Sequence, residues 1–283
     1  MRVLVTGGSG RVGVAASHDL LAHGYEVVNA DRRPPATPIS GVHYCETDLT
    51  DVGQMVGALA GCDALIHLGA IPAPYGHANE VVFGNNVRAT FAALQAASLL
   101  GVRRAVIASS LSALGPAWAP EPFPVLYAPV DEAHPLLVHD AYGLSKEVDE
   151  RTAEMFHRQT GVSVVALRFH WVATVDECIA RVEQLRRAPT ADDWARMSWG
   201  YVDVRDAATA CRLGIEAERI GFAALNITAA DTLSDTPTEE LLRRHTPSVE
   251  IRRPMPGTTT LFALDEAHRL IGYVPAHSWR RTT

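Results

Sequence analysis

Apolar and polar residues alternate along the chain in the order expected of repeated strand and helix units. A short β-branched run at 3–5 ends in a glycine cluster, and a helix-compatible segment follows from Arg11 to about His23. Further strands are predicted at 25–30, 42–45, 64–68 and 104–108, and further helices at 52–59, 79–100 and from 141 to 160. Strands that alternate with helices predict an α/β fold with a parallel, doubly wound sheet of the Rossmann type. The segment 116–135 carries six prolines and is expected to be an irregular loop.

The glycine cluster after the first strand has the spacing G-x-x-G-x-x-G, with glycines at 7, 10 and 13. Glycines at such positions let the backbone turn sharply, approach a pyrophosphate closely and pack the helix against the strand. The backbone N–H groups at the start of the helix, at Arg11 and Val12, then face the phosphates. Strand, glycine turn and helix in this order predict a dinucleotide-binding site.

An acidic residue at the end of the second strand is the next feature expected of such a site, because it accepts hydrogen bonds from the adenosine ribose. Asp31 occupies this position. A carboxylate there repels a 2′-phosphate and favours NAD, whereas Arg32 and Arg33 directly after it are compatible with NADP. We therefore expect NAD, with NADP as the less favoured alternative.

Composition narrows the class of protein. The 283 residues are 47% hydrophobic and 20% charged, which is a globular composition, and the net charge of −7 argues against a nucleic-acid partner. The four cysteines are scattered without a C-x-x-C pair, so the sequence suggests neither a metal site nor a disulfide framework. No basic and apolar leader precedes the first strand, and no apolar run reaches membrane-spanning length. We expect a cytoplasmic protein with no membrane partner.

A second informative stretch lies at the start of the helix that begins near residue 141. Tyr142 and Lys146 are four residues apart, so on a helix they share one face. A free tyrosine has a pKa of about 10, and an adjacent ammonium favours its phenolate. The pair is a plausible device for proton transfer. Ser110 ends the fifth strand, and Ser112 follows two residues later.

Together these motifs resemble the extended branch of the short-chain dehydrogenase/reductase superfamily, the NAD-dependent epimerases and dehydratases. The resemblance runs from Arg2 to about Asp206. The motifs that carry it are, in order, the glycines at 7, 10 and 13, Asp31, Asp48, Leu49, His67, Leu68, Gly69, Ala70, Asn86, Ser109, Ser110, Tyr142 and Lys146.

The resemblance implies roles for individual residues. Asp48 and Leu49 would contact adenine, the backbone at 68–70 the cofactor ribose, and Lys146 the nicotinamide ribose; Asn86 is also expected at the cofactor site. Tyr142 would take the hydroxyl proton of the substrate while hydride passes to the nicotinamide. Ser110 would hydrogen-bond the substrate oxygen, and Ser112 is the alternative residue for that role.

Departures from the family pattern bear on the substrate. Dehydratases usually carry an Asp-Glu pair where this chain has Leu111 and Ser112, so dehydration is disfavoured. The spacing from Arg196 to Asp206 is similar to the carboxylate-binding segment of uronate dehydrogenases, which implies a substrate carboxylate at Arg196, with a solvated arginine as the alternative. In contrast, His170 and Trp171 replace small polar residues of that family and favour a more apolar pocket.

We therefore predict an NAD-dependent oxidoreductase that acts on a hydroxyl or carbonyl carbon of a small sugar or sugar-acid-like substrate, with Ser110, Leu111, Ser112, His170, Trp171 and Arg196 around it. The alternatives are a nucleotide-sugar epimerase with tightly bound NAD and a non-catalytic dinucleotide sensor. Residues 1–170 are expected to form the NAD-binding domain. Residues 171–283 are expected to form mostly a substrate-binding lobe, with elements that return to the sheet. By analogy with relatives, a homodimer is expected through the helices at 79–100 and 141–160.

Overall fold

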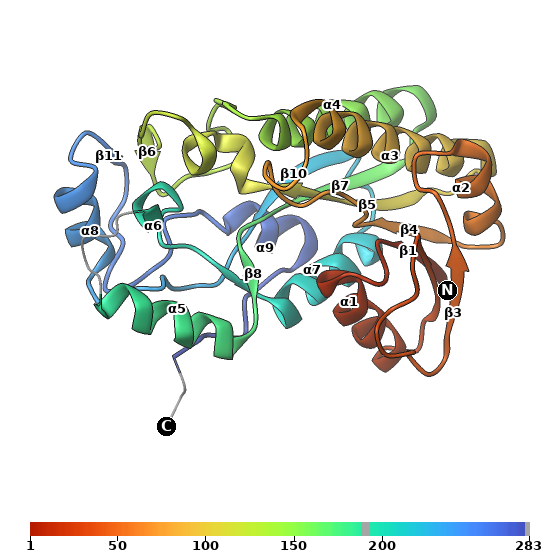
Figure 1. Ribbon diagram of the computed structural model, residues 1–283, viewed down its shortest axis with the longest axis horizontal. Helices are drawn as coiled ribbons and strands as arrows, with labels where there is room; N and C mark the ends of the chain where they lie inside the picture. The colour runs from red at the N-terminus through yellow and green to blue at the C-terminus, as the bar shows by residue number, and fades with distance from the viewer. Residues whose placement is uncertain (188–192, 281–283) are drawn as a thin grey trace.

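A seven-stranded parallel sheet runs through the molecule (Figure 1). The computed structural model describes residues 1–187 and 193–280. In their order across the sheet, the strands are β10 (Phe222–Ile227), β7 (Ser163–Phe169), β5 (Arg104–Ser110), β4 (Ala64–His67), β1 (Arg2–Thr6), β2 (Glu26–Asp31) and β3 (Val42–Glu46). From β1, the chain adds β2 and β3 on one side of the sheet and then β4, β5, β7 and β10 on the other side. The strand order therefore reverses between β1 and β4. In doubly wound folds, a crevice for ligands forms at this switch point, outside the carboxyl ends of the strands.

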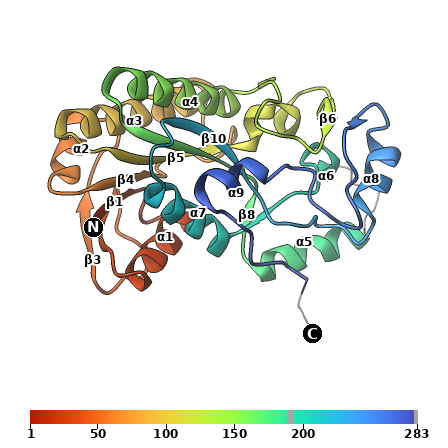
Figure 2. The same cartoon turned by 180° about the vertical axis from the view of Figure 1, so that it is seen from behind.

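Helices cover both faces of the sheet (Figures 1 and 2). One layer consists of α1 (Arg11–Ala22), α7 (Val204–Glu216) and α9 (Asp265–Ile271), and the other of α2 (Val52–Leu59), α3 (Asn79–Leu100) and α4 (Ala141–Thr160). Strand β1 contributes to the packing on both faces of the sheet, because successive side chains of a strand point to opposite faces. Val3 and Val5 pack toward the α1 and α7 layer, and Leu4 packs toward the α2 and α3 layer. The predicted Rossmann fold is confirmed.

Local capping explains where the site-bearing helices begin and end. Asp51 precedes α2 and its side chain accepts a hydrogen bond from the N–H of Gln54, which satisfies a free N–H group at the start of the helix. Asp140 caps α4 in the same way, through the N–H of Gly143. Helix α3 ends at Gly101, whose φ of 71° is the left-handed conformation that glycine adopts without strain.

A second hydrophobic core lies beyond the sheet and is built around aromatic side chains, with Trp194, Trp199, Tyr201 and Trp279 among its buried members. It is surrounded by α5 (Val175–Arg187), α6 (Asp193–Arg196), α8 (Thr238–His245) and two small sheets, in which β6 (Tyr127–Ala128) pairs with β11 (Glu250–Ile251) and β8 (Val172–Ala173) with β9 (Val202–Asp203). The proline-rich segment 116–135 contributes β6 and a short 3-10 turn, η2 (Pro116–Trp118), to this part. Helix α7 and strand β10 return to the main sheet, and a domain boundary at residue 170 stays a prediction.

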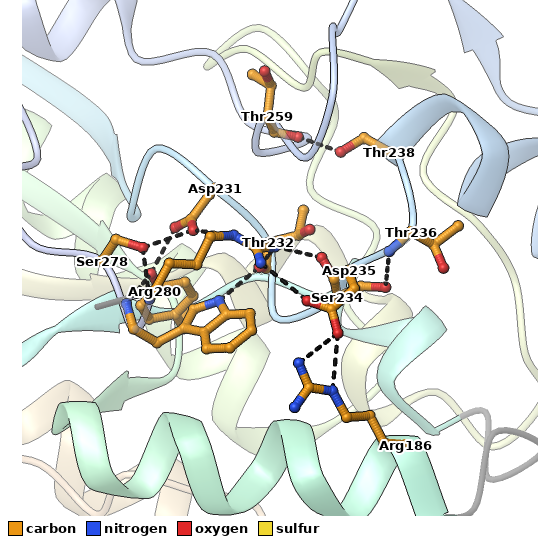
Figure 3. Close-up of polar contacts among 12 residues, drawn as sticks. Arg186, Asp231, Thr232, Ser234, Asp235, Thr236, Thr238, Thr259, Ser278 and Arg280 are labelled. Carbon is orange, nitrogen blue, oxygen red and sulfur yellow. Dashed lines mark hydrogen bonds and ion pairs between the residues drawn. The ribbon is translucent and has the colours of Figure 1, made fainter. Parts of the chain in front are cut away.

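The C-terminal segment is fastened to this second core by a cluster of polar contacts (Figure 3). The buried indole of Trp279 donates from Nε1 to the carbonyl of Thr232 at 2.9 Å. The guanidinium of Arg280 lies 3.0 Å from Asp231 and 3.2 Å from Asp235. Asp235 also accepts two hydrogen bonds from Arg186, which connects the C-terminal end of α5 to the same cluster.

Candidate active site

A cavity of about 1030 Å³ opens where β1, β4, β5 and β7 end. The predicted site residues that line it are Gly7, Gly10, Arg11, Val12, Gly13, Leu68, Ala70, Ser110, Leu111, Ser112, Tyr142, Lys146, His170, Trp171 and Arg196. Their elements are far apart in the sequence but share the carboxyl edge of the parallel sheet. The cavity therefore extends from the glycine turn to the substrate residues that the sequence predicts.

The glycine turn is shaped so that side chains are excluded from it. Gly7 has a φ of +65°, and a Cβ atom there would lie 2.7 Å from the backbone nitrogen of Gly69. A Cβ atom on Gly13 would lie 2.2 Å from the carbonyl oxygen of Gly7. Both approaches are shorter than carbon contacts allow. The bare backbone is thus required by the close packing of α1 on β1, and it leaves the cradle that a pyrophosphate needs.

The residues expected around adenine and its ribose lie outside the cavity lining, next to the glycine turn. Asp31 accepts hydrogen bonds from the N–H of Ser9 at 3.2 Å and from the N–H of Arg32 at 2.7 Å. The backbone and hydroxyl of Thr50 hydrogen-bond to Asp48 and lower the pKa of this carboxyl. Leu49 packs so closely against Gly69 that a Cβ atom on this glycine would lie 2.0 Å from it.

Asn86 is buried in α3 and organises the loop that follows β4. Its side chain accepts from the N–H of Ile71 at 2.8 Å and donates to the carbonyl of Ile71 at 3.1 Å. It also donates to the hydroxyl of Ser145 at 3.1 Å, which ties the loop to α4. These contacts position the backbone beside Ala70, and a direct contact of Asn86 with the cofactor stays a prediction.

Tyr142 and Lys146 face the cavity from the first turns of α4. The ammonium of Lys146 lies 5.9 Å from the centre of the Tyr142 ring. It donates to the carbonyl of Ala108 in β5 at 2.9 Å, two residues before Ser110. The hydroxyl of Ser110 accepts from the N–H of Ser112 at 3.1 Å and so caps the short turn η1 (Leu111–Leu114). The three predicted catalytic side chains are therefore held around one space by β5 and α4.

A buried charged network supports these side chains from behind. Lys146 contacts Asp149 at 3.0 Å. The neighbouring Glu150 accepts a hydrogen bond from Ser109 at 2.6 Å and pairs with Arg168 of β7 through two contacts of 2.8 Å. Burial and the nearby ammonium of Lys146 lower the pKa of His67 to about 3, so this imidazole is neutral. The network joins α4 to both strands that carry the site.

His170 has its two ring nitrogens occupied by the backbone. Nδ1 accepts from the N–H of Trp171 at 2.6 Å, so Nε2 carries the proton and donates to the carbonyl of Met197 at 2.8 Å. Burial lowers the pKa of His170 to about 4. This residue lines the cavity as a neutral, packed group, and its pKa is too low for it to take up a proton near neutral pH.

Several lining residues carry no motif that sequence reasoning recognises. The aromatic ones are Tyr75, Trp118, Phe169, Trp194 and Phe262. Arg181 on α5 also lines the cavity and lies over the rings of Trp171 and Trp194. Arg196 is anchored by a 2.7 Å hydrogen bond to the carbonyl of Ala119. For the aromatic lining residues, the only signal in the sequence was the apolar character of the segments from which they come.

Arg11 lines the cavity at the glycine turn, and its side chain contacts two segments that are distant in the sequence. Its guanidinium donates to the carboxylate of Glu177 at 2.7 and 2.8 Å and to the carbonyl of Val172 at 2.7 Å. The glycine turn is thereby joined to β8 and α5. A role of the Arg11 backbone at the cofactor stays a prediction.

Fold and site together define a dinucleotide-dependent enzyme with a tyrosine and lysine pair at the switch point of a Rossmann sheet. The model of the NAD dependent epimerase/dehydratase family matches residues 3–227, and the chain belongs to this family. This confirms the resemblance found in the sequence, the class of enzyme and NAD as its cofactor.

The similar proteins include both dehydrogenases and epimerases. The chain is 30% identical to uronate dehydrogenase of Pseudomonas putida over 169 residues, which are 59% of each protein. It is 26% identical to UDP-glucose 4-epimerase of Corynebacterium glutamicum over 100% of this chain and 93% of that one. The structure of MoeE5 in complex with UDP-glucuronic acid and NAD aligns with a TM-score of 0.73 and 26% identity, over 99% of this chain and 95% of that one.

None of the described helices is long and apolar enough to cross a membrane. Within residues 1–187 and 193–280, no three side chains of His, Cys, Asp or Glu gather in a way that would hold a metal ion.

Proposed function

We propose that the protein oxidises a hydroxyl carbon of a small sugar or sugar acid, or reduces the corresponding carbonyl, with NAD as hydride acceptor or donor. The observation that carries this proposal is that Ser110, Tyr142 and Lys146 line the same cavity as the glycine turn. Bound NAD supplies a nicotinamide carbon that accepts or releases hydride. The residues of the chain supply the binding, the orientation and the proton transfer.

The proposed roles follow from the position and chemistry of each side chain. Tyr142 removes the proton of the substrate hydroxyl, because loss of hydride without loss of this proton would leave a high-energy cation. Lys146 favours the phenolate through its charge, and the carbonyl of Ala108 holds it in place. Ser110 hydrogen-bonds the substrate oxygen, and Ser112 is the alternative for this role.

The proposed cofactor contacts lie at the other end of the cavity and directly beside it. The turn formed by Gly7, Gly10 and Gly13 fits a pyrophosphate because side chains are excluded there. We assign Asp31 to the adenosine ribose, Asp48 and Leu49 to adenine, and the backbone of Leu68, Gly69 and Ala70 to the ribose. Arg32, Asn86 and the backbone of Arg11 and Val12 complete the proposed cofactor shell.

The substrate is proposed to lie between Tyr142 and the second hydrophobic core. Leu111, Ser112, His170, Trp171 and Arg196 line this end of the cavity. Arg196 can pair with a substrate carboxylate through the part of its guanidinium that does not bind Ala119. The relation to uronate dehydrogenase supports a sugar acid, and the aromatic lining favours a substrate with an apolar face.

The test is the absorbance of reduced nicotinamide when uronic acids, aldoses and simple secondary alcohols are offered with NAD. We expect NADH formation with at least one member of the panel and its loss in Tyr142→Phe. If no member of the panel gives NADH although the protein still binds NAD, the proposal of a dehydrogenase is contradicted. The sensor alternative would then gain weight.

A second candidate is a nucleotide-sugar epimerase with tightly bound NAD. It is favoured by the epimerase of C. glutamicum, which aligns with the entire chain, whereas the uronate dehydrogenase aligns with 59% of it. An epimerase reduces its own keto intermediate and releases no NADH. Chromatographic separation of UDP-glucose and UDP-galactose after incubation distinguishes the two enzymes.

We also propose a homodimer through α3 and α4 and a location in the cytoplasm. Large apolar side chains are exposed on these two neighbouring helices at Val81, Phe91, Leu99 and Leu144. The four cysteines are free thiols, which is compatible with the cytoplasm. Sedimentation velocity should give a dimer that Phe91→Glu dissociates, whereas Leu126→Glu, a change at an exposed residue outside both helices, should not affect it.

A further inference from the structure

The charges that line the cavity all have one sign. Its charged lining residues are Arg11, Lys146, Arg181 and Arg196, and none of the described residues that line it is Asp or Glu. This contrasts with the net charge of −7 of the whole chain. A cavity lined by cations alone favours anionic ligands. The pyrophosphate of NAD accounts for the end at the glycine turn, so Arg181 and Arg196 favour an anionic group on the substrate at the other end.

Two of the four cations are already paired with carboxylates that lie outside the lining. Arg11 binds Glu177 with two hydrogen bonds, and Lys146 binds Asp149. Arg196 uses one nitrogen for the carbonyl of Ala119. Among the side chains that the structure describes, which leave out 188–193 and 281–283, no ion pair involves Arg181. Its one hydrogen bond in that part of the chain is to the amide oxygen of Gln184 at 2.9 Å.

Among the described side chains, two aromatic rings and no anion hold the guanidinium of Arg181. Its central carbon lies 5.0 Å from the ring centre of Trp194 and 5.8 Å from that of Trp171. The two indoles meet edge to face, with 5.3 Å between their centres. Stacking occupies the flat faces of a guanidinium and leaves N–H groups at its edge free to donate. Such an edge matches the two oxygens of a carboxylate.

Helix α5, which carries Arg181, is held at both ends. Glu177 ties its first turn to Arg11 of the glycine turn. Arg186 in its last turn contacts Asp235 of the polar cluster that also receives Arg280 (Figure 3). These contacts place Arg181 at a defined position in the cavity wall, which lowers the entropic cost of binding a ligand there.

We propose that Arg181 binds the carboxylate of the substrate. The rest of the substrate molecule, here called its body, is apolar or ring-shaped. This inference rests on the proposed function and refines it, because it names a second cation besides Arg196 and a class of substrate. The body lies against the aromatic lining that includes Trp118 and Phe262. A sugar acid with an apolar ring face and an aryl hydroxy acid both have this chemistry.

The experiment measures binding without turnover. The protein is first saturated with NADH, and its affinity for NADH is recorded. Calorimetry then compares two matched pairs of ligands, galacturonate with galactose and 3-phenyllactate with its neutral amide. The variants are Arg181→Gln, Arg181→Lys and, as the matched control, Arg187→Gln. Arg187 lies on the same helix with a side chain that is 82% exposed.

We expect one acid at least to bind about tenfold more tightly than its neutral partner, as charge-assisted hydrogen bonds imply. Arg181→Gln should remove this preference, Arg181→Lys should keep part of it, and Arg187→Gln should keep all of it. Thermal unfolding and NADH affinity should be the same in all variants. Which of the two acids binds then tells whether the body is a sugar or an aryl group.

Three outcomes would overturn the proposal. One is equal affinity for acid and neutral partner in both pairs. Another is an acid preference that survives in Arg181→Gln, which would assign the anion to Arg196 alone. The third is binding of UDP-glucose that depends on Arg181 while neither acid binds, because the anion would then be a diphosphate. None of these readouts requires NADH formation, so failure of this proposal and failure of the dehydrogenase are distinguishable.

Discussion

The Nζ atom of Lys146 lies 3.0 Å from Oδ2 of Asp149, one turn further along α4, and the two side chains are 4% and 1% exposed. Burial alone disfavours an ammonium, but the carboxylate of Asp149 holds the pKa of Lys146 above its ordinary value. The ammonium that is proposed to favour the phenolate of Tyr142 is thus partly neutralised by a buried carboxylate. Asp149 is a positioning residue, because it acts through Lys146.

Replacement of Asp149 by Asn should shift the pH dependence of the reaction. Without the carboxylate, the charge of Lys146 acts more fully on Tyr142, so we expect the acid limb of kcat/KM for alcohol oxidation to move to lower pH by roughly one unit. The other charged groups nearby are not expected to add a limb, since His67 is neutral and Glu150 is paired with Arg168.

The control for this prediction is Glu147→Gln, which removes the same charge from the same helix. Glu147 is half-buried, whereas Asp149 is buried against Lys146. The control should leave the profile unchanged. A shift of the Asp149→Asn profile to higher pH would contradict the prediction, because it would mean that the carboxylate mainly keeps Lys146 protonated.

The two serines of the site should contribute unequally to catalysis. The hydroxyl of Ser112 accepts from the indole of Trp118 at 3.2 Å, and the hydroxyl of Ser110 caps η1. We expect Ser110→Ala to lower kcat/KM roughly 10²-fold, as loss of a donor to the reacting oxygen does, and Ser112→Ala to lower it less than about tenfold. Steady-state kinetics of both variants decide this, and the reverse order would assign the serine role to Ser112.

Substitution of Gly13 by Ala should abolish the cofactor cradle. The added Cβ atom would lie 2.2 Å from the carbonyl oxygen of Gly7, so α1 has to move away from β1. We expect NAD binding to weaken by at least about tenfold, together with a loss of roughly 1–3 kcal/mol of stability. Titration with NAD and thermal unfolding measure the two effects.

Gly57 in α2 is the matched control for this substitution. It is exposed, and a Cβ atom there would meet no atom within 4 Å. Gly57→Ala should therefore leave NAD binding unchanged and raise stability by about 0.5–1 kcal/mol, because alanine is favoured over glycine inside helices. Equal NAD affinity in the Gly13→Ala variant and the Gly57→Ala variant would show that the turn does not hold the cofactor.

The sequence was most informative where a single segment determines its own structure. The predicted bounds of α2 and α3 match the structure, because local features define them: the apolar spacing within each helix, Asp51 directly before α2 and Gly101 directly after α3. The glycine turn and the pair of Tyr142 and Lys146 were found for the same reason. Their geometry depends on neighbours at most a few residues away.

Residues brought to the cavity from distant segments were not predictable in this way. Arg181 belongs to a helix between β8 and α6, and only tertiary packing places it over Trp194. Trp118 and Phe262 come from two segments outside the main sheet that are more than a hundred residues apart in the sequence. Asp149 had a local signal, since a residue three positions after Lys146 lies on the same helical face. Only the structure shows that Asp149 is buried against Lys146, and this burial makes the contact important for the charge of Lys146.

His170 should make the protein less stable in acid. Its pKa of about 4 in the folded protein lies below the ordinary value of 6.5, so the unfolded chain binds more protons as the pH falls. The stability that it contributes is lost from pH 6.5 downward and is gone below about pH 4. In His170→Gln, the decrease in the free energy of unfolding between pH 7.5 and 4.5 should be smaller by roughly 2–3 kcal/mol. Urea unfolding at both pH values measures this, and an unchanged decrease would contradict it.

The C-terminal cluster should derive its stability from Trp279 and not from its exposed ion pairs. The indole of Trp279 is buried in the second core and hydrogen-bonded to Thr232, so Trp279→Ala should cost about 3–5 kcal/mol. Arg186 and Asp235 are more than half exposed, and Arg186→Ala should cost less than about 1 kcal/mol. Chemical unfolding of the two variants tests the contrast. A large loss of stability in Arg186→Ala would mean that the contact of Arg186 with Asp235 is needed to hold α5 in place. The affinity of this variant for acidic ligands should then fall as well, because Arg181 would lose its fixed position.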